Sequence, residues 1–122
     1  MIKPNARLVY VAGPYTHGDV ELNVIEAKRC GAAIMQSGHA PYIPHLNHHF
    51  HAEFPQDCED WFTVQLVILR RCDIVFRIPG YSPGADREVQ EALRCDLPVF
   101  FTEQELLAAL EAEDLTDGVR VA

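Results

Sequence analysis

Long apolar runs are missing from this chain of 122 residues, and basic side chains are scarce. No stretch approaches the roughly 20 apolar residues of a membrane-spanning helix, and residues 1–6 hold no apolar segment of signal-peptide length. Ten lysines and arginines stand against eighteen aspartates and glutamates, which gives a net charge of -8 and argues against nucleic acid polymers as partners. We therefore expect a cytoplasmic protein that contacts neither membrane nor nucleic acid, although small anions need only local donors.

Paired cysteine motifs are also missing. The four cysteines form no C-x-x-C pair, and reduced, partly buried thiols are expected at Cys30, Cys58, Cys72 and Cys95. The chain has no internal repeat, low-complexity tract or linker, and its length suits one domain with a substantial core. We predict a single domain over 1–122, with its core at about 7–101 and a C-terminal helix with an acidic tail at 102–122.

What the chain does contain is an alternation of short apolar strands with helices. The strands are expected at 7–12, 39–43, 73–78 and 98–101, and the helices at 19–37, at 57–71, after Ser82 and after Thr102. This order predicts an α/β, flavodoxin- or Rossmann-like three-layer sandwich with a short parallel sheet in the order 2-1-3-4. Ligands of such folds bind beyond the carboxyl ends of the strands, where the strand order reverses.

The helix after residues 73–78 carries an acid among its core-facing positions. Its predicted N-cap is Ser82, its first helical residue is Pro83, and its apolar face contains Ala85, Glu88, Val89, Ala92 and Leu93. A carboxylate is costly to desolvate, so Glu88 should either lose its charge or face a cavity. The alternative is a solvated acid favoured by the helix dipole.

Residues 84–92 read Gly-Ala-Asp-Arg-Glu-Val-Gln-Glu-Ala, and they follow a Cys-Asp-Ile-Val strand. This Gly-x-x-x-Glu-x-x-x-Ala pattern, together with Val-Tyr-Val-Ala-Gly-Pro-Tyr near the N-terminus, resembles the nucleoside 2-deoxyribosyltransferase family, which includes deoxynucleoside 5′-monophosphate N-hydrolase-like proteins. In that family the motif glutamate attacks C1′ of the sugar and forms a glycosyl-enzyme ester. The resemblance implies that Glu88 is the catalytic nucleophile.

The same resemblance implies an activity and its partners. The expected reaction is cleavage of the N-glycosidic bond of a nucleoside or nucleoside 5′-monophosphate, with a 2′-deoxy sugar, by hydrolysis or base transfer. No cofactor and no metal are expected. The partners would be the small-molecule nucleoside or nucleotide and further copies of the chain, since relatives form homodimers or larger homo-oligomers.

Two glycine-bearing loops should face one crevice at the end of the sheet. Gly13 and Tyr15 in the first loop, and Ser82 and Gly84 in the second, are the predicted substrate-binding residues, with Tyr15 holding the nucleophile or the sugar. In the N-hydrolase relatives a serine six residues before the nucleophile holds the phosphate, and Ser82 stands at that position. A capping role without substrate contact is the alternative for Ser82.

One position departs from the family's pattern. The family has an aspartate eight residues before the strand-opening aspartate, and counting back from Asp73 reaches Gln65. A glutamine can orient a sugar hydroxyl but cannot shuttle a proton. Gln65 is therefore predicted to bind substrate, and His45 and Asp60 are the candidate proton donors.

Four of the six histidines fall within residues 45–51, in a segment expected to be a loop. The spacing H-x-x-H-H-x-H matches no closed tetrahedral metal site, so these residues are expected at the rim of the active-site mouth. Two other hypotheses stay open: a metal-assisted hydrolase that uses the His45–His51 loop, and a catalytically weak nucleotide-binding or sensing module in which Gln65 marks lost catalysis. Trp61 is expected in the core or a subunit interface rather than stacked on a base.

Overall fold

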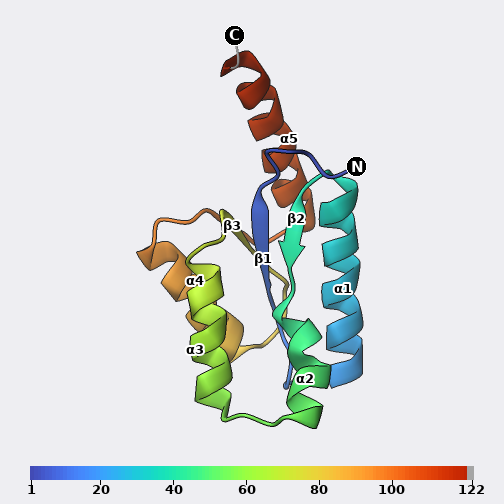
Figure 1. The fold of residues 1–122 in the computed structure, drawn as a ribbon, viewed down its shortest axis with the longest axis vertical. Helices are drawn as coiled ribbons and strands as arrows, with labels where there is room; N and C mark the ends of the chain where they lie inside the picture. The colour runs from blue at the N-terminus through green and yellow to red at the C-terminus, as the bar shows by residue number, and fades with distance from the viewer. Residues whose placement is uncertain (121–122) are drawn as a thin grey trace.

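The computed structural model describes the backbone of residues 1–120 and the side chains of residues 1–112. Within this range, strands and helices alternate along the chain (Figure 1). The strands are β1 (Leu8–Ala12), β2 (Ala40–Tyr42), β3 (Ile74–Arg77) and β4 (Val99–Phe100). The helices are α1 (Val20–Gln36), the 3-10 helix η1 (Pro44–Asn47), α2 (His48–Glu53), α3 (Cys58–Leu69), α4 (Pro83–Arg94) and α5 (Glu103–Arg120).

The described strands form one parallel sheet in the order β2-β1-β3-β4. In its centre, Tyr10 of β1 is in register with Tyr42 of β2 on one side and Val75 of β3 on the other. The chain therefore reverses its direction of winding between β1 and β3. This confirms the predicted α/β class and the predicted strand order.

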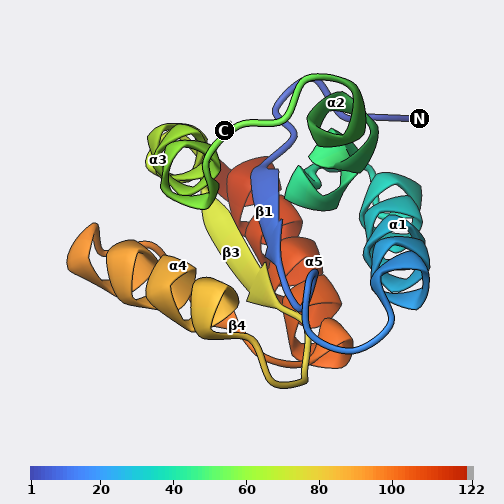
Figure 2. The same cartoon turned by 90° about the horizontal axis from the view of Figure 1, so that it is seen from below.

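Alternation along the strands divides the core between the two faces of the sheet. Val9 and Val11 pack with α1 and α5, while Tyr10 and Ala12 pack with α3 and α4. Figure 2, which looks along the sheet, shows these two pairs of helices on opposite sides of the strands. Both faces are covered, which is why the strands read as nearly continuous apolar runs in the sequence.

The predicted helix starts are confirmed by their capping bonds. The Asp19 carboxylate accepts a hydrogen bond from the Leu22 N–H at 3.1 Å, and the Ser82 hydroxyl oxygen accepts one from the Ala85 N–H at 3.1 Å. At the start of α5, Thr102 Oγ1 accepts from the Glu105 N–H at 3.2 Å. Each side chain satisfies a backbone donor that the first turn of a helix leaves free.

The segment 44–56 is not the loop that the sequence predicted, because it forms η1 and α2. Phe50 of α2 meets the ring of Phe54, the residue that follows this helix, and the ring of Trp61 of α3, both edge-on, the latter with centroids 5.1 Å apart. These aromatic contacts stabilise a helix of only six residues, too short to be stable alone. The expectation for Leu93 was also wrong: its side chain is 60% exposed, beside the buried face of α4.

No helix among the described residues combines the length and apolar character needed to cross a membrane. The last helix reaches Arg120. The acidic tail expected in this region lies partly outside the described side chains, because three of the six acids in 103–122 come after residue 112.

Candidate active site

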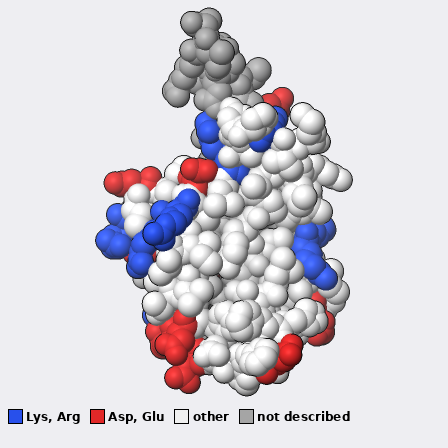
Figure 3. Space-filling view, in the orientation of Figure 1, with Lys and Arg blue, Asp and Glu red and all other residues white. Residues whose placement is uncertain are grey.

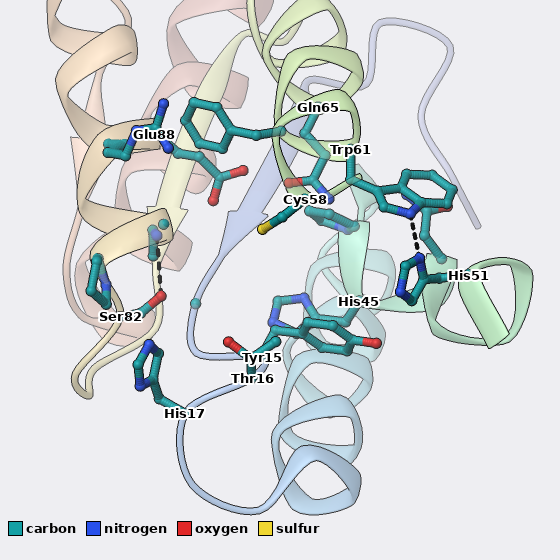
Figure 4. A pocket seen from close by; sticks show the side chains of 18 of the residues that line it. Tyr15, Thr16, His17, His45, His51, Cys58, Trp61, Gln65, Ser82 and Glu88 are labelled. Carbon is teal, nitrogen blue, oxygen red and sulfur yellow. Dashed lines mark hydrogen bonds between the residues drawn. The ribbon is translucent and has the colours of Figure 1, made fainter. Parts of the chain in front are cut away.

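A cavity of about 500 Å³ lies beyond the carboxyl ends of β1 and β3. This is the place that the reversed strand order predicts for a ligand. Its walls come from the loop after β1, from η1 and α2, from α3, and from the first turns of α4 (Figure 4). It encloses Gly13, Tyr15, His45, Gln65, Ser82, Gly84 and Glu88, so the structure brings these predicted site residues together.

Glu88 is the buried acid of this cavity. Only 5% of the residue is exposed, and its carboxylate projects from α4 into the cavity, toward the wall that carries Gln65 and Cys58 (Figure 4). Burial raises the pKa of Glu88 to about 7, although a hydrogen bond from Tyr10 and the positive charge of Arg77 both act to lower it. Glu88 is therefore no solvated helix acid, and near neutral pH both of its protonation states are populated.

Tyr10 is a site residue that the sequence analysis missed. It lies fully buried in the middle of β1, and its hydroxyl donates a short hydrogen bond to Glu88 Oε2. Burial, and then the nearby Glu88 carboxylate, raise the pKa of Tyr10 well above its usual value, so the hydroxyl keeps its proton. A tyrosine hydroxyl in a buried strand needs a hydrogen-bond partner, and this requirement could have indicated from the sequence that Tyr10 contacts a polar group.

Tyr15 was expected to hold either the nucleophile or the sugar. Its hydroxyl lies 2.6 Å from Nδ1 of His48 and does not hold Glu88, and its ring meets the His45 ring edge-on, while contact with the sugar stays a prediction. Tyr15 thus lines the cavity, while the hydrogen bond to Glu88 comes from Tyr10.

The two glycines of the cavity serve different purposes. At Gly13, a Cβ atom would stand 2.8 Å from Cβ of Ile78, so the loop after β1 packs too closely on the end of β3 for any side chain. At Gly84, a Cβ atom would meet no protein atom within 4 Å. Gly84 therefore leaves open space at the start of α4, next to the buried Ser82 hydroxyl.

His45 is 4% exposed and lies at the start of η1. Its Nε2 is 3.0 Å from the Pro14 carbonyl oxygen, and because a carbonyl only accepts, Nε2 carries the proton. Burial lowers the pKa of His45, so the ring is neutral, and its buried Nδ1 has no hydrogen-bond partner among the described residues. Nδ1 is thus an unused acceptor in a cavity-lining residue.

Of the other histidines in this region, His48 and His49 meet edge-on with ring centroids 5.4 Å apart, whereas His48 and His51 have different hydrogen-bond partners. His48 meets Tyr15, and Nδ1 of His51 accepts a hydrogen bond from the Trp61 indole N–H at 2.6 Å. Among the described residues, no three side chains of histidine, cysteine, aspartate or glutamate are placed to hold a metal ion. Trp61 lines the cavity and packs against Phe50 of α2, so it does not lie in the core, and its expected place in a subunit interface stays a prediction.

One face of α3 forms a wall of the cavity, with side chains spaced i, i+3, i+4 and i+7. These residues are Cys58, Trp61, Phe62 and Gln65. Asp60 falls between them on the turn, so it is exposed and does not line the cavity, which removes it as the expected proton donor. Cys58 was not predicted as a lining residue. Within the described part of the chain, Glu88 is the one carboxylic acid in this cavity.

Residues 7–102 match the family described as a domain of unknown function, DUF7768. The chain belongs to this family. No curated protein matches the chain. Among solved structures, a 2-deoxyribosyltransferase from the psychrotolerant bacterium Bacillus psychrosaccharolyticus aligns over 75% of this chain and 69% of that one, with a TM-score of 0.55 and 20% sequence identity.

At this identity the likeness establishes a shared fold for the DUF7768 domain. All residues that line the cavity fall within the matched range 7–102. The cavity is therefore a feature of the DUF7768 domain itself, and its chemistry has to be argued from the side chains that line it.

Proposed function

We propose that this DUF7768 domain cleaves the N-glycosidic bond of a 2′-deoxynucleoside or its 5′-monophosphate through a glycosyl ester on Glu88. The observation that carries this proposal is the buried Glu88 carboxylate, which faces a cavity of small-molecule size and has a pKa of about 7. A desolvated carboxylate that ionises near neutral pH is a suitable nucleophile for a sugar carbon.

The reaction is a double displacement. A Glu88 oxygen bonds to C1′ as the C1′–N bond breaks, and the electron pair of that bond leaves with the base, which takes up a proton from solvent. A water oxygen, or the nitrogen of a second base, then bonds to C1′ while the ester bond breaks and its electron pair returns to Glu88. The proton of the attacking water passes to solvent, so hydrolysis yields the free sugar and the free base.

The 5′ end of the substrate is assigned to the start of α4. The Ser82 oxygen caps the helix by accepting from Ala85, which leaves the hydroxyl hydrogen to donate toward a ligand. The helix dipole favours an anion at this end, and Gly84 leaves the space for it. These features favour a 5′-monophosphate over an uncharged 5′-hydroxyl.

His45 is assigned to substrate recognition rather than to proton donation. Its one ring proton is already given to Pro14, and its neutral Nδ1 can only accept. We assign Nδ1 to a hydroxyl or amino hydrogen of the substrate. A phosphate oxygen carries lone pairs without a hydrogen and would be repelled there, which is consistent with a 5′ end at α4.

The test is chromatography of products after incubation with a panel of nucleosides and their 5′-monophosphates. The expected result is release of free base from at least one 5′-monophosphate, with Glu88→Gln inactive as the matched control because it keeps size and polarity. Release at an equal rate by Glu88→Gln, or no release from any member of the panel, would contradict the proposal.

A second candidate is a nucleotide-binding module without turnover. It is favoured by one observation, that Gln65 stands in the cavity where a proton-donating acid is needed. Gln65→Asp separates the two candidates. If the protein is an enzyme, the parent protein should release base, and Gln65→Asp should release it about 100-fold faster. A binding module should bind nucleotide tightly and release base only in the Gln65→Asp variant.

A further inference from the structure

Arg77, the last residue of β3, is a buried cation outside the lining of the cavity. Only 8% of the residue is exposed, although it stands at the end of a strand that is otherwise apolar. A buried charge is costly unless it is paired and hydrogen-bonded, so its partners indicate its role.

The guanidinium of Arg77 fastens the loop between β3 and α4. It donates a short hydrogen bond to the Ile78 carbonyl, a second to the Gly80 carbonyl at 2.9 Å, and a third to the Asp86 carboxylate at 2.9 Å. Gly80 has a φ of +123°, a conformation that favours glycine. The planar fork of Arg77 therefore ties the loop that leads to Ser82 to the first turn of α4.

Arg77 is also bound to the helix that carries Glu88: its guanidinium lies 2.9 Å from Asp86, two residues before Glu88 on α4, and both Arg77 and Glu88 are buried. A buried positive charge beside this turn of α4 favours the ionised carboxylate and acts to lower the pKa of Glu88, against the effect of burial. The other groups near Glu88 are the Tyr10 hydroxyl from β1 and, across the cavity, His45 from η1 and Cys58 from α3. Tyr10 keeps its proton and His45 is neutral, so neither of them supplies a positive charge.

The other charged residues within one turn of Glu88 on α4 are paired with other side chains. Glu91 is paired with Arg70 and Arg94. Asp86 is paired with Arg77, and its side chain is 66% exposed. Arg87 is paired with Glu59 of α3 at 2.9 Å, and its guanidinium lies over the Phe62 ring. Among the residues that the structure describes, Arg77 is therefore the buried arginine beside this turn of α4.

We infer that Arg77 is a positioning residue for Glu88: its guanidinium fixes the loop before α4 and supplies the positive charge that stabilises the ionised carboxylate. The consequence for catalysis rests on the proposed function, in which ionised Glu88 is the nucleophile. The electrostatic link between Arg77 and Glu88 does not rest on the proposed function, because it can be measured without any substrate.

The experiment is a titration of the Glu88 carboxyl carbon by 13C NMR, with the signal assigned from its loss in Glu88→Gln. Arg77→Gln removes the charge but keeps a donor for the loop carbonyls, and Arg77→Lys keeps the charge but loses the fork. The midpoint should lie near pH 7 in the parent protein. It should rise to about 8 in Arg77→Gln and stay near 7 in Arg77→Lys.

Equal midpoints in the parent protein and Arg77→Gln would overturn the inference, and so would an equal rise in both variants. If Arg77→Gln does not fold, Asp86→Asn takes its place. Loss of the Asp86 charge that pairs with Arg77 should lower the midpoint of the Glu88 titration. An unchanged or raised midpoint in Asp86→Asn would contradict the inference. The pH at which base release begins should move with the midpoint. A shifted midpoint without base release in any variant would leave the inference intact and contradict the proposed function.

Discussion

Glu88 illustrates at the scale of single residues how burial and charge oppose each other. Burial disfavours its ionised form, while the Tyr10 hydroxyl and the Arg77 guanidinium favour it, and the balance leaves the pKa at about 7. Its ordinary value is 4.5. Folding therefore binds a proton at Glu88 between these two pH values, and the stability of the fold must depend on pH.

The sign of that dependence follows from the raised pKa. The stabilisation by protonated Glu88 is fully present below about pH 4.5 and is lost as the pH rises through 7. Relative to the parent protein, Glu88→Gln should gain about 3 kcal/mol of unfolding free energy between pH 4 and pH 8. Urea unfolding across this range measures it. Glu111→Gln, which removes an exposed acid, is the control, and its unfolding free energy should change with pH as that of the parent protein does. If the unfolding free energy of Glu88→Gln also follows the parent protein, Glu88 has no raised pKa.

The two nitrogens of His45 allow its roles to be separated. His45→Gln places an amide near the Nε2 position and should keep the bond to Pro14 but lose the acceptor, whereas His45→Asn should keep an acceptor near Nδ1 and lose that bond. We expect KM to rise about tenfold in His45→Gln with little change in thermal stability, because one hydrogen bond to substrate is lost. His45→Asn should lose stability with a smaller change in KM. The reverse pattern would mean that His45 is structural.

At the scale of secondary-structure elements, the start of α4 combines a helix cap with a predicted anion site. Ser82→Ala should lose about 1 kcal/mol of stability as well as affinity for a 5′-monophosphate. Ser82→Asp should keep the cap, since aspartate caps helices well, but repel the phosphate. Thermal unfolding and KM for a matched nucleoside and its monophosphate measure both effects. Unchanged preference for the monophosphate in Ser82→Asp would show that Ser82 only caps the helix.

At the scale of the whole molecule, we propose that the chain forms a homodimer or larger homo-oligomer. Large apolar residues are exposed on α2, just after it, and on α3, namely Phe50, Phe54, Val64 and Val67. The surface over the middle of α3 and across to α2 carries few charged side chains (Figure 3). A second copy of the same surface would bury these groups. Light scattering should give a multiple of 13.7 kDa that Val67→Glu reduces, and a monomeric parent protein at micromolar concentration would contradict the proposal.

Much of the fold could be predicted because local signals and the overall pattern agree. The caps at Asp19, Ser82 and Thr102 mark helix starts, and the short apolar runs between helices indicate a parallel sheet. The helix α2 could not be predicted, since contacts between its aromatic rings and Trp61 stabilise it and no periodicity in six residues indicates them.

The candidate site was predicted where motif and strand order coincide, as at Glu88, Gly84 and Gln65. It was missed where two distant segments meet. Tyr10 and Glu88 are 78 positions apart, and only the packing of α4 on β1 brings the hydroxyl to the carboxylate. Asp60 was misplaced because its orientation depends on the exact rotation of α3, which the apolar residues around that helix leave undefined in the sequence.

The central claim is that Glu88 becomes bonded to the sugar. Intact-protein and peptide mass spectrometry after incubation with a 2′-fluoro nucleotide analogue tests it most directly, because fluorine at C2′ slows the breakdown of the ester. One added fluorosugar mass is expected on the peptide that contains Glu88, labile in mild base and absent from Glu88→Gln. Base release by the parent protein without an adduct on that peptide, or full activity in Glu88→Ala, would contradict it.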